Sequence, residues 1–255
     1  FFYAFLLDSN RHRVDTGVMA DSDDEPETEY EPESFEIGGL SMEITTVAFL
    51  PIEVLMGNRE KDKEISGQKL WCGSLGVIQY ILNFPEKVTG RLVVELGAGT
   101  GVLGMICKKL GASDVLLTDH DIISINHMNK DIHHNQLDVQ VKQLDWYRPS
   151  FDGWEVDASP GTVIVAGDVL YKKILIEPFF ETTKLLFSRY SESVTMILCH
   201  IPRAGVEQQL IVDAATAHGF VVTTVSRDMW ATGDCFKYCE ADDLSRATLY
   251  LINSS

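Results

Sequence analysis

The sequence lacks the features that mark several classes of protein. None of its apolar runs approaches the roughly 20 residues that a membrane-spanning helix needs. The opening FFYAFLL lacks the basic flank and the small-residue cleavage site of a signal peptide. No cluster of Lys and Arg stands out, and the formal net charge is -17, whereas a nucleic-acid binder normally presents a basic face to the phosphates. We therefore expect neither a membrane nor a nucleic acid as a partner.

The cysteines form no recognisable metal or disulfide pattern. There are five, and no two of them form a Cys-x-x-Cys motif. Cys107 and Cys199 lie in apolar runs and are predicted to be small core residues. Cys235 and Cys239 could share a metal ion or a disulfide, but a nearby pair of further ligands is missing. This cysteine usage favours a reducing compartment, which is the cytosol (a cytoplasmic location) or the nucleus.

Charge is distributed unevenly along the chain. Residues 21–36, DSDDEPETEYEPESFE, hold nine acids, two prolines and no base. Like-charge repulsion and a shortage of apolar surface predict that this acidic segment is a disordered linker. We therefore divide the chain into an N-terminal segment, residues 1–34, and one folded domain, residues 35–255, which is long enough to bury a sizeable core.

The spacing of apolar residues predicts the elements of this domain. Residues 35–49 alternate around Gly38-Gly39 and predict a β-hairpin, and residues 70–84 show helical spacing. After residue 90 strands alternate with helices. The expected strands cover residues 92–96, 114–119, 139–146, 162–168, 194–200, 221–226 and 247–252, and the expected helices cover residues 101–111, 121–135, 173–190 and 205–218.

This order of elements predicts the fold class. Continuous apolar strands that alternate with helices are typical of an α/β protein with a doubly wound, mostly parallel, Rossmann-like sheet of seven strands. The connection between the last two strands shows no obvious helix, so these strands are predicted to be an antiparallel pair. Ligands of such sheets lie at the carboxyl ends of the strands, so the residues that follow each strand are the candidate site.

The first strand of the alternating part runs into a glycine-rich loop. The stretch VVELGAGTGVLG contains Gly99-x-Gly101-x-x-Gly104, the spacing of a dinucleotide-binding turn. In such a turn backbone N–H groups receive a pyrophosphate, which the carboxylate of Glu95 at the mouth of the loop would oppose. S-adenosylmethionine carries a sulfonium and an α-ammonium and no phosphate. Glu95 therefore favours S-adenosylmethionine over a nicotinamide cofactor.

Acidic and aromatic residues follow the next three strands. Asp119 ends the second strand, about 20 residues after the glycine turn, where an acid typically binds a ribose diol. Trp146 ends the third strand and either stacks on an adenine or packs on the core as a rim aromatic. Asp168 and Tyr171 follow the fourth strand, and a carboxylate with an aromatic ring can hold and desolvate an amine.

These segments together resemble a known family. They are Trp71, Glu95-Leu96-Gly97-Ala98-Gly99-Thr100-Gly101, Thr118-Asp119, Leu144-Asp145-Trp146 and Gly167-Asp168-Val169-Leu170-Tyr171. The set resembles the seven-strand S-adenosylmethionine-dependent methyltransferases and, more narrowly, the eukaryotic protein-lysine methyltransferases known as methyltransferase family 16. The resemblance runs from about residue 35 to the end of the printed sequence.

The resemblance implies a reaction and a role for each residue. The reaction is methyl transfer from S-adenosyl-L-methionine to a protein substrate, at a lysine side-chain amine, and relatives act on chaperones, calmodulin and translation factors. Asp168 and Tyr171 would be the catalytic residues that face the lysine. Residues that would line the cofactor are Trp71, Glu95, Gly97, Ala98, Gly99, Gly101, Asp119, Trp146 and Gly167. The chain departs from many relatives at Ala166-Gly167-Asp168, where they read Gly-Ala-Asp, and at His200-Ile201-Pro202-Arg203, where they have a Glu-Arg or Arg-Tyr-Glu type segment.

Other functions stay open at this point. A small-molecule methyltransferase would use the same loop, and a non-catalytic scaffold would bind the cofactor without turnover. A nicotinamide oxidoreductase would match the glycine spacing but not Glu95. A nucleic-acid methyltransferase is disfavoured by the net charge, and it would usually show an Asn/Asp-Pro-Pro-aromatic motif where this chain has Asp168-Val169-Leu170-Tyr171.

The histidines allow two further interpretations. His120, His127, His133 and His134 crowd one strand-helix unit, where they either hold a metal ion or serve as surface and capping residues. Methyl transfer from a sulfonium needs no metal, so we assign none to the site. His200 follows the fifth strand near the expected mouth of the site and is a candidate for a substrate contact.

Overall fold

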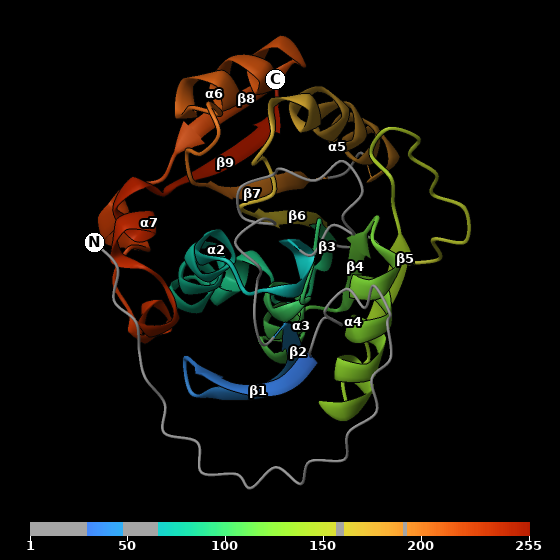
Figure 1. Cartoon of the computed structure of the whole chain (residues 1–255). Helices are drawn as coiled ribbons and strands as arrows, with labels where there is room; N and C mark the ends of the chain where they lie inside the picture. The colour runs from blue at the N-terminus through green and yellow to red at the C-terminus, as the bar shows by residue number, and fades with distance from the viewer. Residues whose placement is uncertain (1–29, 48–65, 157–160, 191–192) are drawn as a thin grey trace, which may run out of the picture.

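The computed structural model describes residues 30–47, 66–156, 161–190 and 193–255. Within them, seven strands form one sheet in the order β5-β4-β3-β6-β7-β9-β8 (Figure 1). The strands of this sheet are β3 (Leu92–Leu96), β4 (Asp114–Asp119), β5 (Gln140–Gln143), β6 (Thr162–Gly167), β7 (Val194–His200), β8 (Phe220–Thr224) and β9 (Thr248–Ser254). The first five pair in parallel, and β9 runs antiparallel between β7 and β8. The predicted fold class is confirmed.

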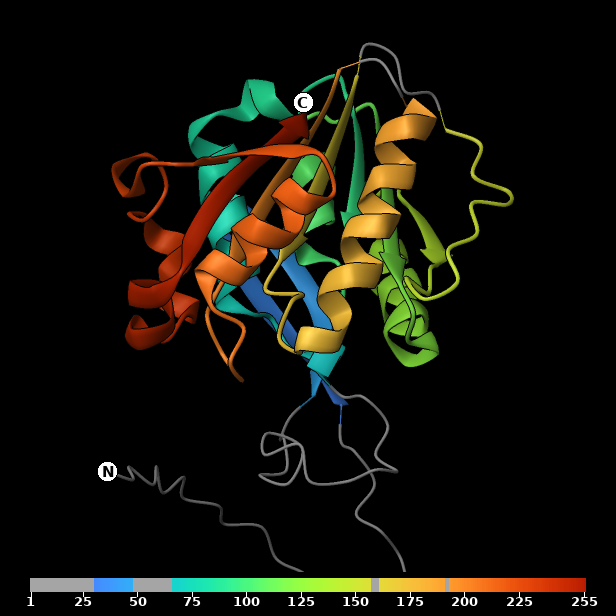
Figure 2. The ribbon, with the colours of Figure 1, turned by 90° about the horizontal axis from the view of Figure 1, so that it is seen from above.

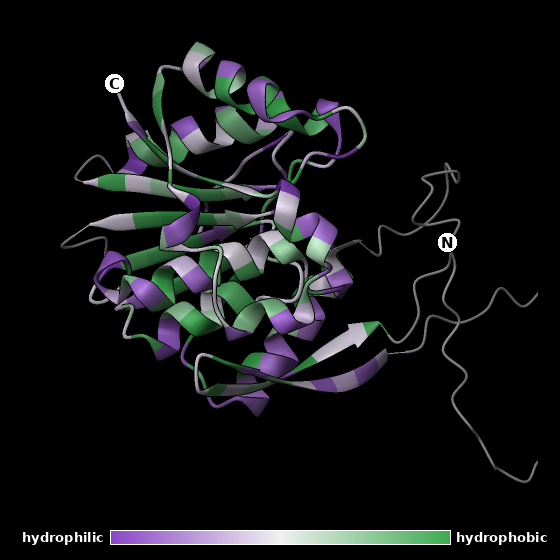
Figure 3. Ribbon diagram, turned by 90° about the vertical axis from the view of Figure 1, so that its left-hand side faces the viewer, coloured by the Kyte–Doolittle hydropathy of each residue, from purple (hydrophilic) through white to green (hydrophobic). Residues whose placement is uncertain are grey.

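Helices cover both faces of the sheet, as Figures 1 and 2 show. On one face lie α2 (Cys72–Asn83), α3 (Val102–Lys109) and α4 (Ile122–His134), and on the other lie α5 (Ile176–Tyr190) and α6 (Gln208–Ala217). Every residue of β3 and β6 is buried, because central parallel strands are enclosed on both sides. Apolar residues concentrate on the strands and polar ones on the outer sides of the helices (Figure 3).

A hairpin packs beneath α2, α3 and α4. It consists of β1 (Tyr30–Ile37) and β2 (Leu40–Val47), and its turn residues Gly38 and Gly39 have φ angles of 58° and 76°. Such left-handed angles are those of the two-residue turns that match strand twist. The free edge of β2 is tied to α4, where the Thr45 N–H donates to Asp131 Oδ2 at 2.9 Å. The buried apolar side chains of the hairpin are Phe35, Ile37, Met42 and Ile44.

Two sequence predictions about elements are wrong. β1 begins at Tyr30, so residues 30–36 of the acidic segment form a strand, because their backbone pairs with β2 while the acidic side chains stay in solvent. Residues 1–29 lie outside the described residues, so the predicted linker is untested there. The connection from β8 to β9 carries the helix α7 (Ala241–Arg246) and the short 3-10 helices η4 (Arg227–Met229) and η5 (Asp234–Tyr238). Six residues are too few to show a helical period in the sequence.

The cysteine pairing also differs from the alternatives drawn from the sequence. Cys239 forms a disulfide with Cys72, 167 positions earlier in the chain. Cys235 is a buried free thiol, as are Cys107 and Cys199, which confirms the core positions predicted for the last two. Sequence spacing could not reveal the pair because the fold, not the local chain, brings the first turn of α2 beside the segment before α7.

Two features are absent from the described residues. No helix in this part of the chain combines the length and apolar character that a membrane crossing requires. Within the same ranges no group of three or more His, Cys, Asp or Glu side chains is placed to hold a metal ion.

Candidate active site

The glycine loop lies between β3 and α3, at the carboxyl edge of the sheet. Gly97, Gly99 and Gly101 have φ angles of 66°, 55° and 73°, which residues with a side chain rarely adopt. The Ala98 N–H donates to Thr118 O at 2.9 Å, and the Gly101 N–H donates to Ala98 O at 2.8 Å. These bonds fix the loop against the end of β4, where the sequence placed it.

A segment that precedes α2 crosses this loop. It contains the 3-10 helix η1 (Ser66–Gln68) and ends at Trp71, the residue before α2. A Cβ atom on Gly99 would lie 2.6 Å from the carbonyl oxygen of Gly67, so the two backbones are in direct contact. Gln68 is buried and accepts a hydrogen bond from Tyr30 Oη at 2.7 Å. The segment therefore forms one wall of the loop, and Gly67 was not among the predicted site residues because no motif marks it.

Asp119 ends β4 beside the loop, as predicted. Its Oδ2 accepts from the Gly99 N–H at 2.9 Å, and its Oδ1 accepts from the Asp121 N–H at 3.0 Å. The carboxylate is buried and spans the loop and the start of α4. The two oxygens of this carboxylate, held by backbone donors, suit the hydroxyls of a ribose. Ribose binding by Asp119 stays a prediction.

Glu95 occupies a different position from the one expected. Its side chain is 2% exposed, and Oε2 accepts from the Gly104 N–H of α3 at 2.8 Å. Burial raises the pKa of Glu95 to about 8, which the Gly104 hydrogen bond opposes and Asp119 reinforces. The carboxyl group lies under the loop and holds the first turn of α3. The prediction of direct contact with a bound cation is therefore not supported by this geometry.

Trp146 follows β5 and stands next to the loop. A Cβ on Gly97 would lie 3.3 Å from the Trp146 ring, and this ring packs edge-on against Phe179 of α5 at 5.1 Å between centroids. The half-buried ring thus joins the loop to the core on the α5 side. Packing as a rim aromatic is confirmed, and stacking on an adenine stays a prediction.

Asp168 follows β6 in a strained conformation. Its φ is 60°, in the left-handed region that residues other than glycine adopt at a cost of about 1 kcal/mol or more. Its N–H donates to Cys199 O of β7 at 2.8 Å, and the residue is 6% exposed. Strain of this kind persists where the surrounding structure enforces it, and it is concentrated at functional sites.

The first turn of α2 enforces the position of Asp168. A Cβ on Gly73 would lie 2.6 Å from Asp168 N, and a Cβ on Gly167 would lie 2.5 Å from Ser74 N. Glycine on both sides lets the helix and the strand end pass in backbone contact. Gly167 was predicted to line the cofactor, but the space left by its missing side chain is filled by α2. Lining by its backbone stays a prediction.

Arg203, in the loop after β7, pairs with Asp168. Its Nη2 lies 2.6 Å from Asp168 Oδ2 and 3.6 Å from Asp243 Oδ2 of α7, and its guanidinium lies 5.0 Å from the centroid of the Trp71 ring. Burial raises the pKa of Asp168 to about 7, and the charge of Arg203 opposes that rise. From the sequence, Arg203 stood out only as a departure from relatives. A base just after β7, beside an acid just after the neighbouring β6, was the available signal.

Tyr171 and His200 differ in how they match their predicted roles. Tyr171 is half buried, with Lys172 Nζ 5.2 Å from its ring centroid, and its contact with a substrate stays a prediction. His200 is fully buried, and its Nε2 lies 3.0 Å from Val206 O. Burial lowers the pKa of His200. The prediction that His200 contacts substrate is wrong for this structure, because the last residue of β7 points into the core.

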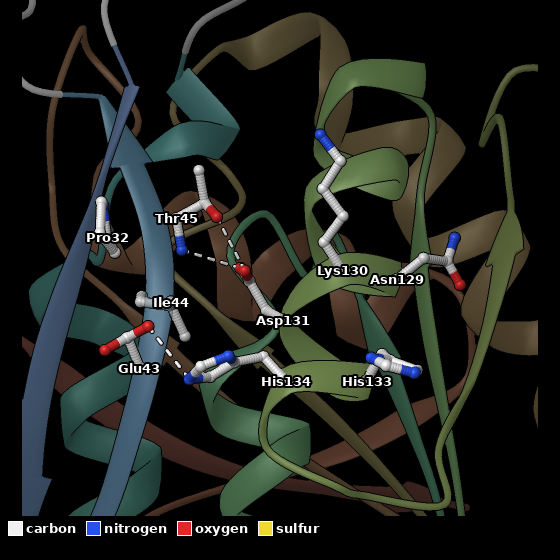
Figure 4. Close-up of a pocket in the computed structure, with 9 residues that line it drawn as sticks. All are labelled: Pro32, Glu43, Ile44, Thr45, Asn129, Lys130, Asp131, His133 and His134. Carbon is white, nitrogen blue, oxygen red and sulfur yellow. Dashed lines mark hydrogen bonds and ion pairs between the residues drawn. The ribbon is translucent and has the colours of Figure 1, made fainter.

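A groove of about 600 Å³ lies elsewhere, between β2 and the end of α4 (Figure 4). His134 Nε2 lies 3.0 Å from Glu43 Oε1 there (Figure 4), and His133 also lines the groove. None of the residues that line the groove is among those predicted to bind the cofactor or the substrate. His133 and His134 are surface residues of the last turn of α4, as the simpler interpretation of the histidines predicts.

The fold and the site define a class: a Rossmann-like α/β protein whose glycine loop and strand-end acids are arranged for a nucleoside-containing cofactor. A family model described as lysine methyltransferase matches residues 53–213, well over half of the chain. The chain belongs to this lysine methyltransferase family.

Curated relatives agree with that placement. The human electron transfer flavoprotein beta subunit lysine methyltransferase is 26% identical over 133 residues, which cover 49% of this chain and 45% of the relative. Protein N-terminal and lysine N-methyltransferase efm7 of Neurospora crassa is 34% identical over 68 residues, 26% of this chain and 24% of the relative. The chain thus spans less than half of either relative's length.

A solved structure shows the fold. The T. thermophilus 16S rRNA N2 G1207 methyltransferase (RsmC), in complex with AdoMet and guanosine, superposes with a TM-score of 0.56 at 16% identity, over 90% of this chain and 52% of that one. At this identity the likeness concerns the fold alone.

Proposed function

We propose that the chain transfers a methyl group from S-adenosylmethionine to the side-chain amine of a lysine in a protein substrate. The observation that carries the proposal is Asp168, a strained and buried carboxylate that contacts the first turn of α2 and follows β6, the strand next to β3 and its glycine loop. Family membership supports the reaction type. The two curated relatives are named as lysine methyltransferases, which supports the choice of lysine.

The residues around the loop fit S-adenosylmethionine. The loop glycines leave room for close approach of a ligand to the backbone, Asp119 suits a ribose diol, and Trp146 offers an aromatic edge. The Asp119 carboxylate at the end of β4 lies against the loop, where it accepts from the Gly99 N–H. This charge suits a cationic cofactor better than a pyrophosphate.

The protein's part in the reaction is to orient and to desolvate. When bound, S-adenosylmethionine supplies a methyl group already activated by the sulfonium. The lysine must be a neutral amine when it attacks the methyl carbon, although its free pKa is about 10.4, and a nearby positive charge lowers that pKa. Asp168 would accept a hydrogen bond from the amine and stabilise the positive charge that develops on nitrogen. Loss of the lysine proton to water before methyl transfer is sufficient, so Asp168 need not act as a base.

A labelling experiment tests the proposal. The protein and its Asp168→Ala variant are incubated separately with methyl-labelled S-adenosylmethionine and a desalted cell lysate, and cofactor binding is measured in the same preparations. We expect a labelled protein band with the wild type and none with the variant. Label confined to protein-stripped extract would indicate a small-molecule methyltransferase, and cofactor binding without any label would indicate a non-catalytic scaffold. The compartment, cytosol or nucleus, stays a prediction.

A further inference from the structure

The carboxylate that the proposed reaction needs is covered by a cation of the same chain. Arg203 Nη2 contacts Asp168 Oδ2 at 2.6 Å, and the Asp168 side chain is only 1% exposed. Asp168 Oδ1 is buried and has no hydrogen-bond partner among the described residues. A basic side chain from outside therefore reaches Asp168 only if Arg203 moves away.

A second acceptor for Arg203 lies within reach. Asp243 Oδ2 of α7 is 3.6 Å from the same Nη2 atom, and Arg246 holds the other oxygen of Asp243 at 2.6 Å. The side chains of Arg203 and Asp243 are each about a quarter exposed, so this pair lies at the rim and Asp168 lies beneath it. A small rotation of the arginine exchanges a buried partner for one at the surface.

The place that the guanidinium occupies is built for a cation. It is bounded by the Asp168 carboxylate, the Asp243 carboxylate and the face of Trp71, whose ring centroid lies 5.0 Å away. Carboxylates and an indole face attract a basic side chain. The contacts that Arg203 makes are those that the basic side chain of a substrate would need.

We infer that Arg203 occupies the substrate's cation subsite in the free protein, and that Asp243 receives Arg203 when a basic side chain of the substrate enters. The inference rests on the proposed function and adds to it the residues that select the substrate. Exchange of one cation for another keeps the buried carboxylate paired throughout, which avoids the large cost of an isolated buried charge.

Arginine has a chemical advantage in this position. Its guanidinium stays protonated at any physiological pH, so its nitrogens are poor nucleophiles and it is not methylated while it waits. A lysine at the same position would carry an amine that can lose its proton. Its nitrogen lone pair would then form the bond to the methyl carbon, and the carbon–sulfur bond would break with its electron pair left on sulfur as S-adenosylhomocysteine.

The substitution Arg203→Lys tests the inference without a known substrate. The purified variant is incubated with S-adenosylmethionine alone, and peptide mass spectrometry searches for methyl groups on the introduced lysine. We expect this lysine to be methylated, and to stay unmethylated after addition of Asp168→Asn. Arg227→Lys is the matched control, because Arg227 likewise lies over a tryptophan, 5.3 Å from the Trp230 ring centroid, but bonds to carbonyl oxygens instead of Asp168.

The outcomes separate this inference from the proposed function. Methylation of the lysine introduced by Arg203→Lys, but not of the one introduced by Arg227→Lys, supports both. Absence of methyl groups from the Arg203→Lys variant, in a series whose wild type labels a lysate protein, overturns the inference and leaves the proposed function standing. Absence of methylation from both experiments, with cofactor binding intact, rejects the proposed function and the inference with it.

A binding measurement completes the test and needs no turnover. n-Butylamine, which mimics the end of a lysine, is titrated into the wild type and into Arg203→Ala by calorimetry, with 1-butanol as the uncharged control and thermal unfolding as the check of folding. We expect the variant to bind the amine about tenfold more tightly, because Arg203 no longer competes for Asp168. Equal affinity in two folded proteins would show that Arg203 does not occupy the subsite.

Discussion

Two neighbouring strands of the sheet each end in a buried carboxyl group, but the two groups have different partners. Glu95 of β3 is bound by a backbone N–H of α3, whereas Asp168 after β6 is bound by the side chain of Arg203 at the rim. Burial raises the pKa of both groups, to about 8 for Glu95 and about 7 for Asp168. A backbone partner cannot be exchanged without unfolding the helix, but a side-chain partner can.

The difference separates architecture from chemistry. Glu95 lies under the glycine loop and holds the first turn of α3. Its charge state therefore affects the free energy of unfolding and the shape of the loop that is expected to contact the cofactor. Asp168 is held in a strained conformation by α2 and is covered by a group that can rotate away. Burial and a perturbed pKa alone would have ranked the two alike as candidate reactive groups.

Conservative substitution of the two carboxyl groups gives the largest predicted contrast. Asp168→Asn is expected to lower the rate of methyl transfer to the labelled lysate protein by about a thousandfold, because the amine loses a charged acceptor in a dry site. Glu95→Gln is expected to retain most of the rate, since its amide oxygen still accepts from the Gly104 N–H. Equal losses of rate in the two variants, with cofactor binding measured as the control, would contradict a structural role for Glu95 and a catalytic role for Asp168.

The disulfide sharpens the comparison on the Asp168 side. Cys72 begins α2, and Cys239 precedes α7, so the bond ties the helix that fixes Asp168 to the segment that carries Asp243. The variant Cys72→Ser/Cys239→Ser is expected to lower the free energy of unfolding by about 2–4 kcal/mol. Hydrogen exchange should rise in the first turn of α2 and in α7 more than in the glycine loop, whose hydrogen bonds do not involve these segments. A uniform rise would contradict this division.

A smaller effect is expected from a methyl group on the glycine loop. Gly99→Ala combines a left-handed φ of 55° with a contact to the Gly67 carbonyl oxygen, and it should cost about 2 kcal/mol of stability and weaken cofactor binding. Gly90→Ala is the matched control, because its φ is 71° but a Cβ there meets no atom within 4 Å. Chemical denaturation and calorimetric titration would measure both variants. Equal destabilisation of the two variants would show that the segment before α2 moves away from the added methyl group without a cost in free energy.

Much of the fold was predictable because the strands are buried on both faces. β3, β4 and β6 stand out as short apolar runs, and the glycines and acids that follow them stand at the sheet edge that the parallel arrangement dictates. Asp119 and Asp168 were found in this way. The position of a residue in the sequence could not predict the orientation of its side chain. The side chain of Glu95 lies under the loop, and that of His200 lies in the core.

The parts that escaped prediction depend on contacts between distant segments. Arg203 meets Asp168 because β7 lies beside β6, Asp243 approaches from a short helix without a readable period, and Cys72 finds Cys239 across most of the domain. Local patterns carry no information about such pairs. The substrate-facing half of the site is therefore where the structure added most to the sequence.

The pH dependence of the free energy of unfolding compares both carboxyl groups directly, and its change per pH unit is, for each group, the smallest effect. Burial raises the pKa of Glu95 from 4.5 to about 8 and that of Asp168 from 3.8 to about 7. The folded protein thus keeps protons that the unfolded chain releases. The stabilisation that these protons contribute is fully present below about pH 4. It is lost as the pH rises to about 7 for Asp168 and to about 8 for Glu95. Each group contributes a slope of at most about 1.4 kcal/mol per pH unit.

Urea unfolding between pH 5 and pH 9 measures these slopes in the wild type, Glu95→Gln and Asp168→Asn. In each variant, the pH dependence of the free energy of unfolding should lack the contribution of the carboxyl group that was replaced. Glu95→Gln should remove the dependence that extends above pH 7. Burial lowers the pKa values of His127 and His200 and makes them act in the opposite direction, but their contribution is common to all three proteins and cancels in the differences. If the slope of the free energy of unfolding against pH is unchanged in Glu95→Gln, Glu95 is already ionised in the folded protein. The interpretation of Glu95 as a neutral group that accepts from the Gly104 N–H would then be wrong.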